Sequence, residues 1–174
     1  MSFKTSFAAG LLVLAAALAA AQGTVTYKID GQAFRFQDAR LEYHPSEGYF
    51  SLDCERQDTV RLKDGSDWEA YAGLTIQLAG EPKSFVGSHE ANSSDEMPVY
   101  FSWYRLEEDQ ALDFLASLDE GDPARMKMLL KIEAFGAPGK PVRGSFSGTL
   151  FDEEGVLHTI SDGVFSVPRT DVQD

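Results

Sequence analysis

The chain contains very little cysteine and histidine, and each scarcity excludes a class of structural feature or site. Cys54 is the only cysteine among 174 residues, so no internal disulfide can form and the fold must rest on packing. The three histidines are isolated in the sequence, with no second His or Cys at ligand spacing, which argues against a zinc site. Phosphate-binding loops, dinucleotide fingerprints and the strand-to-helix nucleophile elbow are also missing.

Long hydrophobic runs are missing too, except near the start of the chain. The first 21 residues follow the three-part pattern of a secretory signal peptide. They contain the basic residue Lys4, the apolar residues 11–14 with the alanines after them, and the small pair Ala19 and Ala21. The run is shorter than the roughly 20 residues that a membrane-spanning helix needs. We therefore expect cleavage near Ala21 and a secreted or periplasmic protein without a lipid anchor, because Gln22 stands where a lipoprotein has its cysteine.

Basic residues are outnumbered by acidic ones. The 15 Lys and Arg residues face 28 Asp and Glu residues, which gives a formal net charge of −13 at pH 7. Nucleic acid and anionic membrane surfaces should repel such a chain as a whole. Its acidic surface either binds a cation or a basic partner, or is solvated without any partner. Hydrophobic residues at 43% and aromatic residues at 11% exclude disorder, because they suffice to build a core.

Alternation of apolar and polar residues dominates the chain after the leader. Val25, Tyr27 and Ile29 alternate with polar neighbours, and Asp30-Gly31 then predicts a tight hairpin turn. Cys54 falls on the apolar side of its strand, as a buried and inert thiol would. The same pattern predicts further strands over residues 33–36, 39–43, 49–55, 59–62, 68–78, 99–106, 126–135, 142–151, 156–160 and 164–167, with turns at 152–155 and 162–163. For residues 126–135 a second helix capped by Asp122-Pro123 is the alternative.

Two segments depart from this alternation. Residues 80–97 carry Gly, Pro, Ser and charges without a period, and we expect them to form mainly loop. Residues 107–119 predict one short amphipathic helix, because acidic residues open the segment and apolar residues recur at spacings of three and four. These apolar residues are Ala111, Leu112, Phe114, Leu115 and Leu118.

Short strands joined by turn residues indicate an all-β fold. We predict that residues 22–174 form a single domain, an antiparallel β-sandwich or partly open barrel, with the helix near 107–119 covering an open end or edge. Within it, Gly144 and Gly148 flank Phe146 on a strand, where they relieve crowding on the Phe146 side.

Aromatic side chains provide one hypothesis for a binding site. Trp68, Tyr100, Trp103 and Tyr104 form a stacking platform for a sugar or another ring-bearing ligand, or else they fill the core, as large aromatics usually do in small β domains. A second hypothesis concerns calcium, because oxygen-rich turns supply hard ligands. Its candidates are Asp64, Asp67, Asp152 and Glu153, although neither turn matches an EF-hand loop.

The C-terminal hairpin carries a resemblance. The segment begins with Gly144-Ser145-Phe146-Ser147-Gly148 and continues through residues 155–165, which contain Ile160-Ser161-Asp162-Gly163 and Phe165. It is similar to the end of many small exported bacterial proteins of uncharacterised function, often lipoproteins. The resemblance covers about 25 residues well. It implies a β-sandwich and no activity, since that group has no established catalytic residues. This chain departs from the group by lacking a lipidation cysteine and by its expected helix.

The leading functional hypothesis is a secreted or periplasmic, envelope-associated protein that binds a small ligand, glycan or envelope protein without transforming it. One alternative is an extracytoplasmic hydrolase, which requires converging acids or a His–acid pair in a cleft. Another is an interaction or inhibitory partner of an envelope protein, which requires a contiguous exposed apolar patch.

Overall fold

The computed structural model describes residues 23–107, 110–119 and 121–173, and the predicted signal peptide lies outside them. Strands dominate the described chain, and none of its helices is long and apolar enough to cross a membrane. The elements are β1 (Gly23–Ile29), β2 (Gln32–His44), β3 (Tyr49–Arg61), β4 (Asp67–Ala79), α1 (Pro82–Phe85), β5 (Gly87–Ala91), β6 (Val99–Glu107), β7 (Gln110–Ser117), β8 (Lys127–Phe135), β9 (Pro141–Asp152) and β10 (Leu157–Asp171).

The strands form one sheet that closes on itself. Hydrogen-bonded neighbours run β1, β2, β3, β4, β6, β7, β9, β10 and back to β1, which makes an eight-stranded barrel. All pairings are antiparallel except a short parallel contact between β10 and β2. The all-β antiparallel prediction is confirmed. A two-sheet sandwich is not, because strand pairing continues around the molecule.

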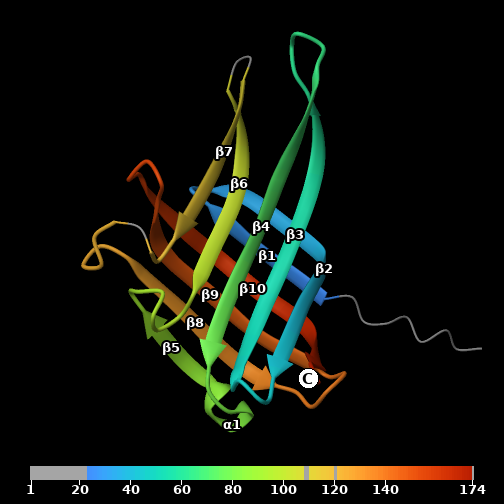
Figure 1. Ribbon diagram of the computed structural model, residues 1–174, viewed down its shortest axis with the longest axis vertical. Helices are drawn as coiled ribbons and strands as arrows, with labels where there is room; N and C mark the ends of the chain where they lie inside the picture. Colours follow the sequence, from blue (N-terminus) through green and yellow to red (C-terminus); the bar gives the residue numbers. More distant parts are fainter. Residues whose placement is uncertain (1–22, 108–109, 120, 174) are drawn as a thin grey trace, which may run out of the picture.

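Two walls of this barrel cross each other in Figure 1. The front wall consists of β3, β4, β6, β7 and the C-terminal part of β2, and the rear wall consists of β1, β10, β9, β8, β5 and the N-terminal part of β2. The strands β8 and β5 continue the sheet beyond the barrel, because β7 and β8 share one edge of β9. Residues 142–149 of β9 pair with β8, and Phe151 and Asp152 pair with Ser117 and Ala116 of β7. Barrel closure between β7 and β9 therefore involves only two residue pairs.

Alternate side chains of both walls fill the barrel. Phe50, Leu52 and Cys54 on β3 face inward beside Leu74 and Ile76 on β4, and all five are buried. Tyr27 stacks on Phe34 and Phe36 and meets Phe101 edge to face at 5.2 Å between ring centroids. The interior is thus a packed aromatic and aliphatic core, held without a disulfide, as the single cysteine required.

The hairpin predictions agree with the strand pairing. Asp30 and Gly31 have φ angles of 48° and 86°, as the tight turn between β1 and β2 requires. Residues 127–135 form strand β8, so the strand interpretation of 126–135 is confirmed. The expected turn at Asp162-Gly163 is instead a bulge inside β10, where the register against β9 shifts between Ile160 and Gly163. Residues 80–97 contain the short helix α1 and strand β5 as well as loop, so the prediction that they are mainly loop was incomplete.

The predicted helix over 107–119 was wrong. Residues 110–117 form strand β7, paired along its whole length with β6. Trp103 pairs with Phe114 and faces the core, and Phe101 pairs with Ala116, so the inward positions alternate as in any strand. Leu115 broke this alternation in the sequence because it faces solvent, at 40% exposure. Strand pairing with β6 and β9 outweighs the local helical pattern.

Gly144 allows close approach of β9 and β8. A Cβ atom there would lie 2.3 Å from the Lys131 carbonyl oxygen and 2.6 Å from the Phe165 ring. We expect Gly144→Ala to lower the free energy of unfolding by about 1–3 kcal/mol, because neighbouring backbone must move. Urea denaturation checks this, with the outward-facing Ser145→Ala as matched control, for which we expect little change. Equal effects of the two substitutions would contradict the packing argument.

Candidate ligand-binding groove

Cross-strand rows of side chains cover the outer face of the front wall. In one row, Thr75 of β4 lies between Asp53 of β3 and Tyr100 of β6. In the next row, Gly73 lies between Glu55 and Ser102. Because side chains alternate across a strand, both rows face outward while their neighbours along each strand fill the core.

The second row leaves a hollow in this face. Gly73 has no side chain and Ser102 has a short one, so a depression of about 130 Å³ forms over this pair, bordered by Glu55, Tyr100 and Leu115. A Cβ atom on Gly73 would lie 2.6 Å from the Cys54 carbonyl oxygen, so the close β3–β4 approach requires glycine here.

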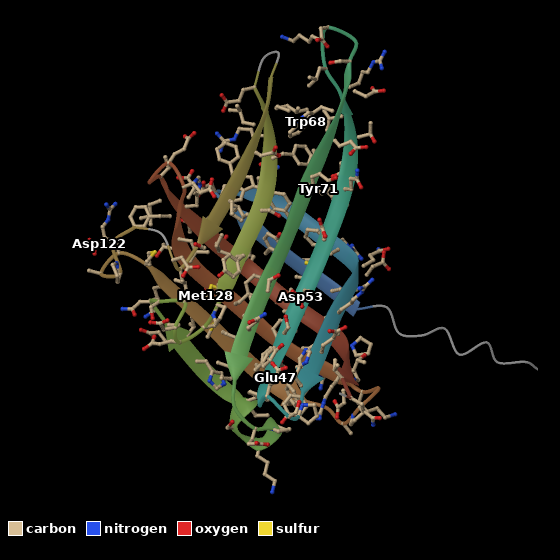
Figure 2. All side chains as sticks on the ribbon, in the orientation of Figure 1. Glu47, Asp53, Trp68, Tyr71, Asp122 and Met128 are labelled. Carbon is tan, nitrogen blue, oxygen red and sulfur yellow. The ribbon has the colours of Figure 1, made fainter. Side chains whose placement is uncertain are left out.

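A larger groove of about 480 Å³ adjoins this hollow across β2, β3 and β4. The two share Glu55 and Thr75 and the backbone beneath them. Tyr71 borders the groove toward the hairpin tip of β4, and Asp53 lies farther down the same face (Figure 2). Together they form an outward-facing site, which we call the front groove, with Asp38, Arg40 and Gln57 as its other polar side chains.

The floor of the front groove is fixed from inside the barrel. The Tyr27 hydroxyl donates a hydrogen bond of 3.1 Å to the Gly73 carbonyl oxygen, and burial raises the pKa of Tyr27 far above its usual value, so this donor stays protonated. Beneath the groove, burial raises the pKa of the Cys54 thiol to about 12. Cys54 is therefore a protonated core side chain and not a nucleophile, in agreement with the interpretation from the sequence.

A carboxylate and two tyrosines are the groups that this groove offers to a ligand. The hydroxyls of Ser51 and Thr75 each donate to the Asp53 carboxylate, which holds its orientation. Tyr71 and Tyr100 are exposed by 42% and 39%, so both rings are accessible to a ligand. The Tyr100 hydroxyl donates to Asp119 at 2.9 Å, and this hydrogen bond raises the Tyr100 pKa above its usual value.

The structure does not gather the four predicted platform aromatics into one surface. Tyr100 borders the front groove, but Trp103 is 1% exposed and lies in the core, stacked on Phe114. Trp68 packs edge to face on Tyr104 at 6.0 Å, and the Tyr104 hydroxyl donates to Asp58. Trp68 and Tyr104 are both half-buried. They lie where the β3–β4 and β6–β7 hairpins extend past the last hydrogen-bonded pair between β4 and β6.

The predicted calcium candidates lie at two separate turns. Asp64 accepts hydrogen bonds from the Ser66 amide and hydroxyl, and Asp67 pairs with Arg61. Asp152 is buried at the end of β9, and Glu153 after it is exposed. Within the described residues, no group of three or more His, Cys, Asp or Glu side chains is placed to hold a metal ion. The calcium hypothesis stays a prediction.

One buried acid–histidine network was not expected from the sequence. His158 of β10 contacts Asp30 at 2.7 Å through Nδ1 and Asp152 at 2.9 Å through Nε2. Asp152 also accepts from the amides of Glu154 and Val156. The His158 side chain is only 4% exposed and packs edge to face against Trp103, so this network joins two turns at the point of barrel closure and is closed to a substrate.

Sequence reasoning missed most of the front groove. Asp53, Gly73 and Thr75 belong to ordinary alternating strands, and no local motif marks them. Two residues beside the hollow left a signal: Tyr100 was one of the predicted platform aromatics, and Leu115 is an apolar side chain that interrupts the strand pattern. Comparison with known proteins adds no further information, because no family model, curated protein or solved structure matches this chain.

Proposed function

We propose that this protein is an extracytoplasmic, envelope-associated binding protein that holds an uncharged saccharide in the front groove without transforming it. The observation that carries the proposal is the hollow over Gly73, bordered by exposed Tyr100 and Leu115 and adjoining Tyr71 and the oriented Asp53 carboxylate. The predicted signal peptide supports the extracytoplasmic location.

The chemistry of the groove favours a polyhydroxylated ligand. Sugar rings present C–H faces that pack on tyrosine rings, and their hydroxyls donate to carboxylates and exchange hydrogen bonds with threonine. Asp38, Asp53 and Glu55 outnumber Arg40 among the side chains of the larger groove, so an anionic ligand is disfavoured.

The buried His158 network is not placed to act on a ligand of the front groove. General acid–base catalysis needs a titratable group within reach of substrate. Both ring nitrogens of His158 are already occupied by Asp30 and Asp152, and the ring is enclosed by Trp103 and Phe114. The hydrolase alternative therefore gains no support from the one histidine–acid cluster described above.

A binding experiment with matched tyrosine variants tests this proposal. We expect isothermal titration calorimetry against neutral cello-, xylo-, malto- and chito-oligosaccharides to find at least one ligand. Tyr71→Ala and Tyr100→Ala should each weaken its binding about 10-fold, or about 1.4 kcal/mol. Tyr49→Ala is the matched control, because Tyr49 lies on the same wall, stacked on His44 and away from the groove.

Two results would contradict the proposal. The first is that no neutral saccharide binds to the correctly folded protein at millimolar concentration. The second is that Tyr49→Ala weakens binding as much as the two groove variants do, since the rings of the groove would then have no special part.

A further inference from the structure

The outer face of the rear wall concentrates basic side chains. Four exposed basic side chains come from four strands: Lys28 on β1, Arg35 on β2, Lys131 on β8 and Arg143 on β9. Each of them pairs across the sheet with a residue whose side chain points to the same face. Lys127 on β8 joins them next to Thr149. This concentration stands out because the chain as a whole carries a net charge of −13.

Carboxylates neutralise only part of this face. Asp162 pairs with Lys28 at 2.8 Å, and Glu90 pairs with Lys127 at 2.8 Å. Glu133 stands at the bulge of β8. Among the residues that the structure describes, no carboxylate lies within 4.0 Å of the charged groups of the remaining three cations, which are Arg35, Lys131 and Arg143.

Two hydroxyl side chains, Ser145 and Thr26, and the exposed Val164 lie between the cations. One continuous cross-strand row runs over β8, β9, β10, β1 and β2, and consists of Lys131, Ser145, Val164, Thr26 and Arg35. Adjacent strands are about 4.8 Å apart, so this row spans about 19 Å along the surface. An extended chain with anionic groups at intervals would meet a cation at both ends of the row and hydroxyl donors between them.

A hollow marks one end of this row. It measures about 290 Å³ and is lined by Thr26, Lys28, Ala33, Arg35 and Asp162, with the inward-facing residues Tyr27 and Phe34 also contributing to its lining. Lys28 and Arg35 approach it from two neighbouring strands, and Asp162 holds the Lys28 ammonium in place from β10. A sulfate or carboxylate group fits this setting, because Arg35 has no acidic partner among the described residues and offers a planar set of donors.

We propose that the outer face of the rear wall binds an anionic polysaccharide, with one of its acidic groups in the hollow between Lys28 and Arg35. Charge complementarity selects an anionic occupant despite the acidic chain. The row described above contains no aromatic side chain on which nucleic acid bases could stack. A second copy is disfavoured, because two molecules of charge −13 repel each other at long range.

Dextran sulfate is the probe for this site, measured by calorimetry with the full chain. We expect binding at 50 mM NaCl that weakens at least 10-fold at 200 mM NaCl, as counterion release requires. Arg35→Gln, Lys131→Gln and Arg143→Gln should each weaken it about 3- to 10-fold, and the triple variant should abolish it. Arg61→Gln is the matched control, since it removes the same charge from the β3–β4 hairpin, where Arg61 pairs with Asp67.

The outcomes separate this site from the front groove. Tyr71→Ala and Tyr100→Ala should leave dextran sulfate binding unchanged, and the triple variant should leave neutral saccharide binding unchanged. The proposal is overturned if the folded protein fails to bind dextran sulfate at 50 mM NaCl, or if Arg61→Gln weakens binding as much as the rear-wall variants. It is also overturned if duplex DNA or anionic phospholipid vesicles bind as tightly as dextran sulfate through the same residues.

Discussion

Replacing His158 with alanine is expected to lower the free energy of unfolding by about 3–5 kcal/mol. Among the described residues, His158 is the only side chain that hydrogen-bonds the buried Asp152 carboxylate. The substitution would leave that carboxylate enclosed with only two backbone amides as donors, and would remove one of the hydrogen bonds that join Asp30 to β10. Urea denaturation followed by tryptophan fluorescence measures the loss.

His44→Ala is the matched control for this prediction. Its ring stacks on Tyr49 and lies 4.0 Å from Glu42, in a far more exposed position, so we expect a loss below about 1 kcal/mol. Asp30→Asn tests the same network more mildly, because the Asp30 side chain is 39% exposed. A loss below about 1 kcal/mol for His158→Ala would show that the network contributes little.

The same network predicts how acid affects stability. Burial raises the pKa of Asp152, but the hydrogen bonds from His158 and from the Val156 and Glu154 amides outweigh it, so the pKa lies below its usual value of 3.8. A carboxyl group with a lowered folded-state pKa stabilises the fold above about pH 4, and this stability is lost as the pH falls through the folded-state value. In His158→Ala, burial acts with less opposition, so acid unfolding should begin at a higher pH.

Replacing Trp103 with alanine is expected to cost about 3–5 kcal/mol of unfolding free energy. The indole is 1% exposed, stacks on Phe114 at 5.2 Å and meets His158 edge to face at 4.7 Å. Its removal would open a cavity between β6, β7 and β10, next to the two residue pairs that close the barrel. Thermal and urea denaturation measure this effect.

Trp68→Ala is the control for Trp103, since it removes the only other tryptophan in the chain. Trp68 is half-buried against Tyr104, outside the closed part of the barrel, and we expect a clearly smaller loss. The fluorescence of the Trp68→Ala variant, which retains Trp103, should be shifted to the blue, as for a buried indole. If Trp103→Ala unfolds no more easily than Trp68→Ala, the assignment of Trp103 to the core is wrong.

Local patterns predicted the strands well where the two faces of the sheet differ in polarity. Val25, Tyr27 and Ile29 alternate because one face of β1 fills the barrel. Asp30-Gly31 identified a hairpin because both central residues of such a tight turn need a positive φ. Few pairs of residue types adopt a positive φ at both positions easily. The pattern failed at Leu115, where an apolar side chain faces outward, and at Asp162, where a bulge resembles a turn in the sequence.

The sequence by itself determined that this protein is an antiparallel β fold with an apolar core, because alternation and turn chemistry act between residues close in the chain. Only the tertiary structure decided that the sheet closes, that residues 110–117 form a strand, and that Asp53, Thr75 and Tyr100 form one row. Cross-strand neighbours lie far apart in the sequence, and no short pattern encodes which strands will pair. The front groove and the basic rear wall both depend on that pairing.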